Sequence, residues 1–105
     1  MKARRFDEIL RARGYKVVSQ TKYDGLNMYI KKHKYNSSYC YVEKDTHGKA
    51  QSMNFNITNN NLPQNMDEFK EAEFDRGYLA KEAEKIHEAF EQLKVLKSPK
   101  HIYCF

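Results

Sequence analysis

Tyrosine, lysine and histidine side chains recur through residues 26–57 at positions where one face of a β-sheet would present them. Apolar residues alternate with them, and a period of two is typical of strands with one buried face. Tyrosine rings on an exposed sheet face can stack on nucleic-acid bases while nearby cations contact phosphates. The same rings can supply contact area to a protein partner. The pattern therefore leaves two kinds of partner open for one surface.

The predicted binding residues fall into two groups. One lies on the predicted strands and combines aromatic with basic side chains; the other lies on the first predicted helix and consists of arginines. The strand group is Tyr29, Lys31, His33, Lys34, Tyr39 and Tyr41, and the helix group is Arg4, Arg5, Arg11 and Arg13.

The positive charge is concentrated in the first part of the chain. Residues 1–62 contain 12 Lys and Arg against 5 Asp and Glu, whereas residues 63–105 contain 7 against 9. A basic surface favours a binding partner that is a nucleic acid or a protein with an acidic surface. Because 14 of the 19 basic residues are lysines, the usual solubilising choice, the charge does not decide between these partners.

Motifs for catalysis and for metal binding are missing. The histidines, His33, His47, His87 and His101, are far apart, and no pair has the spacing of zinc ligands. The chain has no nucleophile elbow, no P-loop and no dinucleotide-binding glycine pattern. We therefore expect a non-catalytic protein that uses neither a metal nor a cofactor.

Two short segments resemble known families. The opening segment KARRFDEILRARGYKVV is similar to the start of HicA-type toxins, in which a helix ends in glycine and an aromatic residue before a strand. That family carries Gly-Ser-His-His after this strand, where the present chain has Lys22-Tyr23-Asp24-Gly25, so the histidine that the nuclease needs is missing. The segment AKEAEKIHEAFEQL resembles the last helix of double-stranded-RNA-binding domains but lacks the Lys-Lys pair at its start.

Length and composition predict one globular domain over residues 1–105, since 40% of residues are hydrophobic and 31% are charged. We expect a cytoplasmic protein without a membrane span, because no apolar run approaches the length that a span requires. The N-terminal residues contain no apolar segment of the kind found in secretory signals. Cys40 and Cys104 are widely separated, which favours reduced thiols.

Residue spacing predicts a helix over residues 2–13 that ends at Gly14, followed by four strands near residues 15–22, 26–33, 39–44 and 50–57. The Asp24-Gly25 pair predicts a tight turn between the first two strands. Short turns between successive strands indicate an antiparallel meander.

The C-terminal part is expected to contain a short helix, capped by Asn65 or Asp67, that breaks near Gly77. A long amphipathic helix would then cover residues 78–97. The apolar residues 101–105 would add an edge strand or pack across the core.

The predicted fold is thus an α+β domain with an N-terminal helix, a four-stranded antiparallel meander, and one short and one long C-terminal helix packed on one face of the sheet. The predicted core consists of Phe6, Ile9, Leu10, Leu26, Met28, Ile30, Val42, Met53, Phe55, Ile57, Leu79, Ala83, Ile86, Phe90 and Leu93.

For function, we expect a binding protein from a phage or mobile element that inhibits or regulates a nucleic-acid-handling, defence-type enzyme. The alternative is a nucleic-acid-binding module that uses the tyrosine–lysine face and the basic first helix. The oligomeric state stays open.

Overall fold

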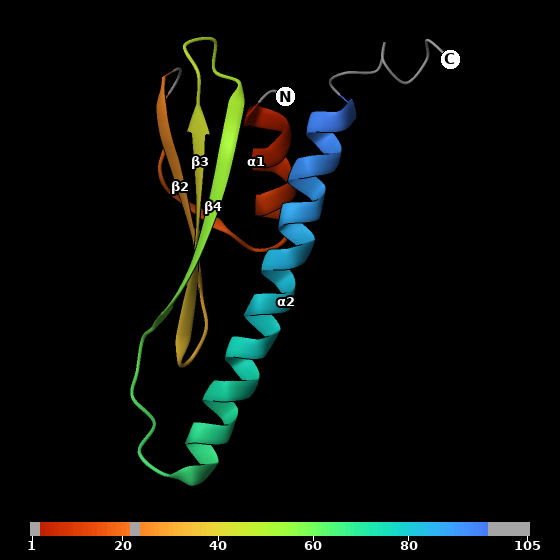
Figure 1. The fold of residues 1–105 in the computed structure, drawn as a ribbon. Helices are drawn as coiled ribbons and strands as arrows, with labels where there is room; N and C mark the ends of the chain where they lie inside the picture. The colour runs from red at the N-terminus through yellow and green to blue at the C-terminus, as the bar shows by residue number, and fades with distance from the viewer. Residues whose placement is uncertain (1–2, 22–23, 97–105) are drawn as a thin grey trace, which may run out of the picture.

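The computed structural model describes residues 3–21 and 24–96. The elements follow in the order α1 (Ala3–Ala12), β1 (Lys16–Ser19), β2 (Gly25–Lys32), β3 (Asn36–Lys44), β4 (Ala50–Asn59) and α2 (Met66–Leu96). The strands form one antiparallel sheet in the order β1-β2-β3-β4. Both helices lie on the same side of this sheet (Figure 1), so the predicted α+β class and the meander are confirmed.

Helix α1 forms where the sequence predicted it. Phe6 and Leu10, four residues apart on one face, are both fully buried. Gly14 follows the helix with φ of +91°, in the left-handed region that glycine adopts without strain. This turn leads the chain into β1.

Helix α2 is continuous, so the predicted short helix and the break at Gly77 are wrong. Asn65 caps the helix, because its Oδ1 accepts a hydrogen bond from the Glu68 N–H at 2.9 Å. The segment before Gly77 is held to the sheet by the Asn36 Nδ2, which donates to the Ala72 carbonyl at 3.1 Å. A single glycine in a helix costs only about 1 kcal/mol, and such contacts offset that cost.

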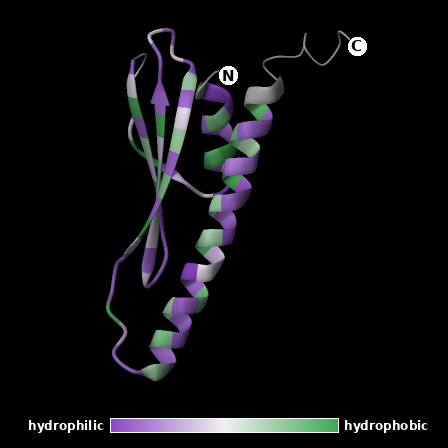
Figure 2. Cartoon of the chain, viewed as in Figure 1, coloured by the Kyte–Doolittle hydropathy of each residue, from purple (hydrophilic) through white to green (hydrophobic). Residues whose placement is uncertain are grey.

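The core lies between the two helices and one face of the sheet. Phe6 of α1 packs edge-on against Phe90 of α2, with ring centroids 5.1 Å apart, and both contact a cluster that includes Cys40 and Val42 of β3. Figure 2 shows hydrophobic and hydrophilic residues alternating along α2, as expected for a helix with one buried side. None of the described helices is apolar enough over a sufficient length to cross a membrane. Residues 101–105, predicted as an edge strand or core segment, lie outside the described residues.

Strand β2 buries the opposite face from the one that the sequence predicted. Asn27 and Tyr29 are only 1% exposed, whereas Leu26, a predicted core residue, is 42% exposed. Met28 and Ile30 share the face of Leu26 and are half-buried.

Hydrogen bonds explain why the polar side of β2 faces inward. The Tyr29 hydroxyl donates to the Asp7 carboxylate of α1 at 2.7 Å. The Asn27 Oδ1 accepts from the Thr21 N–H at 3.1 Å. Because each buried polar group has a partner, its desolvation is compensated, and the large Tyr29 ring joins the core.

Candidate functional site

Five side chains of β2 and β3 form an apolar and aromatic cluster on the side of the sheet away from the helices. Strand register places Met28 opposite Tyr41 and Ile30 opposite Tyr39, and Leu26 continues the row on β2. We call these five residues the open face. The Tyr39 and Tyr41 rings are nearly parallel, at 12°, with centroids 6.3 Å apart. The open face therefore presents a row of aliphatic groups beside a pair of stacked rings.

Polar side chains border the open face. Lys16 pairs with Ile30 across β1 and β2, so it lies on the same face, and Lys32 lies two residues after Ile30. Both lysines are exposed. On the other border, Asn54 and Asn56 of β4 pair with Tyr41 and Tyr39. The cluster is thus apolar in its centre, cationic at the end with Ile30, acidic at the end where Glu43 pairs with Leu26, and neutral along β4.

Three of the predicted phosphate-contacting residues are paired with carboxylates of α2. Lys31 Nζ lies 3.1 Å from Glu82, His33 Nδ1 lies 2.9 Å from Asp75, and Lys34 Nζ lies 3.8 Å from Glu71. Glu82 is 7% exposed, so its charge and that of Lys31 compensate each other in a partly buried position. These contacts join α2 to β2 and to the turn after it, and the Lys31–Glu82 pair is the most buried of the three.

The remaining predicted residues do not form one surface. Tyr29 is buried, and Arg11 donates from Nε to Asp7 at 2.7 Å. Arg4, Arg5 and Arg11 belong to α1, and Arg13 follows its last residue. This helix packs on one side of the sheet, whereas Tyr39 and Tyr41 lie on the other. Arg4 forms a long exposed pair with Glu8 at 3.8 Å; the other two helix-group members, Arg5 and Arg13, complete the exposed or half-exposed basic surface of α1.

A buried polar network that sequence reasoning missed lies between the sheet and α2. The Tyr15 hydroxyl is 2.7 Å from the Ser38 Oγ and donates to Glu82 at 3.4 Å, and Lys31 bonds the same carboxylate. Burial raises the pKa of Tyr15 above its ordinary value, so the hydroxyl stays protonated. The network joins residues 23 and 67 positions apart, a separation that periodicity cannot detect.

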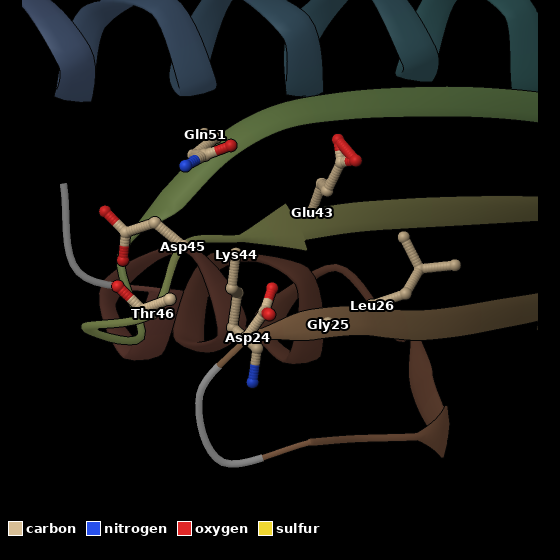
Figure 3. Close-up of a pocket in the computed structure, with 8 residues that line it drawn as sticks. All are labelled: Asp24, Gly25, Leu26, Glu43, Lys44, Asp45, Thr46 and Gln51. Carbon is tan, nitrogen blue, oxygen red and sulfur yellow. The ribbon is translucent and has the colours of Figure 1, made fainter.

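An open hollow of about 510 Å³ lies at the end of the sheet, beside Asp24, Glu43 and Lys44 (Figure 3). Lys44 is 4% exposed, and burial lowers the pKa of its amine. Among the described residues, no three His, Cys, Asp or Glu side chains are grouped so that they could hold a metal ion. The described residues that line the hollow include no hydroxyl or thiol hydrogen-bonded to a histidine or carboxylate.

Cys40 lies under α1 and α2 and is fully buried. Burial raises the pKa of its thiol to about 12, which keeps it protonated. A protonated thiol without solvent access has the properties of a packing residue.

Apolar and aromatic side chains are also exposed along the first half of α2, namely Met66, Phe69, Phe74 and Tyr78. Phe74 is 80% exposed and lies beside Lys34 and Tyr35, while Phe69 is five residues earlier, about 140° around the helix axis. The open face differs from them because strand pairing places its side chains next to one another across β2 and β3.

The sequence matches no protein-family model, no curated protein and no solved structure.

Proposed function

We propose that the protein is a small binding module whose open face docks on another protein. The observation that carries this proposal is the orientation of β2, which turns Leu26, Met28 and Ile30 away from the helices and beside two tyrosines. Contiguous exposed apolar side chains are costly in water and mark interaction surfaces. Tyrosine and methionine are enriched in the centre of such surfaces.

Charge at the border indicates the chemistry of the partner. Lys16 and Lys32 flank the end of the open face that contains Ile30 and Tyr39. A partner with an apolar patch bordered by carboxylates would complement both the centre and this end. Inhibition or regulation of a nucleic-acid-handling enzyme, and an origin in a phage or mobile element, belong to the same proposal and rest on sequence reasoning alone.

Nucleic-acid binding is the weaker alternative. The stacked Tyr39 and Tyr41 rings and two nearby lysines favour it. Against it, Lys31, His33 and Lys34 have carboxylate partners, and Tyr29 is buried. Few free cations then remain beside the rings, and phosphate contacts supply most of the affinity for single strands.

Capture of partner proteins from a host lysate, followed by binding measurements with the purified partner, tests the proposal. Tyr41→Ser and Met28→Ser should each weaken binding of the purified partner about tenfold or more, as expected at the centre of an interface. Phe74→Ser, which removes an exposed aromatic side chain from α2, is the matched control and should bind as the parent protein does.

A salt titration of oligonucleotide binding supplies the opposing outcome. Protein docking through an apolar centre should persist at high salt, and oligonucleotide binding should be weak throughout. Tight oligonucleotide binding that falls steeply with salt and is weakened by Tyr41→Ser would show that the partner of the open face is a nucleic acid and not a protein.

A further inference from the structure

Among the described strands, β4 is an edge strand whose own sequence lacks the charges and prolines that usually protect an edge. It is hydrogen-bonded to β3 on one side only, and it spans ten residues. Residues 50–59 contain no charged residue and no proline, in a chain of which 31% is charged. The register with β3 is regular from Ser52 to Asn59, so no bulge turns this part of the edge away. A long, regular, neutral edge is a template for a further strand.

The opposite edge of the same sheet is protected. Strand β1 has only four residues, begins with Lys16, and contains an irregularity between Val17 and Ser19. Shortness, a lysine and a bulge are the usual means by which proteins prevent strand addition. The contrast points to β4 as the edge that is available for pairing.

The side chains of β4 are arranged symmetrically about Phe55. In an antiparallel pair of identical strands centred on one residue, positions at equal distance on either side of the centre face each other. Around Phe55, each such pair combines side chains of one chemical class: Asn54 with Asn56, Met53 with Ile57, Ser52 with Thr58, and Gln51 with Asn59. Paired hydroxyls and paired apolar groups are stabilising cross-strand partners.

We propose that two copies of this chain associate through antiparallel pairing of their β4 strands about Phe55. The two-fold axis is normal to the sheet, so each copy keeps its helices on the same side and the two sheets continue as one of eight strands. Neutral strands bring no like charges together, which suits contact between two copies of a basic chain. The interface is closed and uses the same surface of both copies.

Burial on the helix-covered side supports the same arrangement. Phe55 and Ile57 point toward the helices but remain half-buried, whereas Met53 on the same strand is buried. A second β4 would place an apolar residue beside each of them and complete the core at this edge. The proposal is independent of the partner proposed for the open face.

Sedimentation equilibrium of the full chain over a wide concentration range tests the proposal, with a dimer expected. In Asn54→Lys/Asn56→Lys, introduced lysines face each other across the axis, and the dissociation constant should rise at least tenfold. In Asn54→Lys/Asn56→Glu, each introduced lysine faces a glutamate of the other copy, and the dimer should be retained. Gln64→Lys/Gln92→Lys adds the same charge as the first variant at exposed positions outside β4 and should also be dimeric.

Three results would overturn the proposal. The first is a full chain that stays monomeric at every concentration reached. A dimer that Asn54→Lys/Asn56→Lys leaves intact, with circular dichroism showing that the variant is folded, would place the contact elsewhere. A monomeric full chain that becomes dimeric when residues 97–105 are removed would show that the chain covers β4 with its own C-terminal segment.

Discussion

Lys44 is a lysine whose side chain is largely buried beside the hollow at the end of the sheet. The residue is 4% exposed and lines the open hollow, and no buried side-chain nitrogen or oxygen of the described residues lacks a hydrogen-bond partner, so the amine is not sealed away unpaired. Burial lowers the pKa of the amine, which means that the protonated form is disfavoured in the folded chain. An alternating pattern of apolar residues gives no sign of such a position, because the cost depends on what surrounds the amine.

Lys44→Met should raise the free energy of unfolding slightly near neutral pH, since it removes an amine whose protonated form is disfavoured by burial. In the parent protein the unfolded chain binds more protons between the lowered folded pKa and the ordinary value of 10.5. Stability should therefore rise with pH through that window. Urea unfolding at neutral and at alkaline pH measures both effects, and an equal pH dependence in the variant would contradict this account.

Tyr29 is an aromatic residue whose role the sequence pattern misassigned. The alternation of β2 was clear, but both sets of side chains contain apolar groups, so the period alone could not choose the buried face. Tyr29 faces inward because its hydroxyl donates a hydrogen bond to Asp7, which lies 22 residues earlier. Such a long-range bond leaves no local signal.

Tyr29→Phe should lower the free energy of unfolding by about 1–3 kcal/mol, because it leaves the Asp7 carboxylate and the Asn27 amide without a buried partner. Tyr41→Phe, on the open face, is the matched control and should change it by less than about 0.5 kcal/mol. Urea unfolding of both variants gives the comparison. Equal losses would mean that the Tyr29 hydroxyl has no special role.

Among the elements, those with a strong local signal were predicted best. Gly14 and the spacing of Phe6 and Leu10 located α1, and the faces of β3 and β4 were assigned correctly from alternation. Helix α2 was predicted as two helices because Gly77 favours a break. The hydrogen bond between the preceding turns and β3 supports the continuous helix. That bond joins residues 36 positions apart, so sequence spacing cannot reveal it.

Gly77→Ala tests whether α2 is one helix. A Cβ at this position would meet nothing within 4 Å, and the backbone is helical. Alanine should raise the free energy of unfolding by about 0.5–1 kcal/mol, because it reduces the freedom of the unfolded chain. Urea unfolding of both proteins measures this change, provided that their m-values agree. Destabilisation would indicate that the chain needs glycine there for a bend.

At the scale of the whole molecule, all the elements are held by one side of the sheet. The contacts of Phe90 join α2 to α1 and to the strands below them, while neither of the two described helices lies on the opposite side of the sheet. Core and binding surfaces are therefore separate. A substitution on the open face, or at a position of β4 that points away from the helices such as Asn54, can change association while leaving folding intact, whereas a substitution at the helix junction cannot.

Phe90→Ala should lower the free energy of unfolding by about 3–5 kcal/mol, the usual cost of truncating a core aromatic residue. The whole free energy of unfolding of a domain is about 5–15 kcal/mol. The variant should therefore melt at a much lower temperature than the parent protein. Because Phe90 contacts Phe6, α1 and α2 should be lost in one transition, with circular dichroism and tyrosine fluorescence coinciding. Phe74→Ala, at an exposed position of the same helix, should leave the melting temperature unchanged; separate transitions in Phe90→Ala would show that α1 is stable without α2.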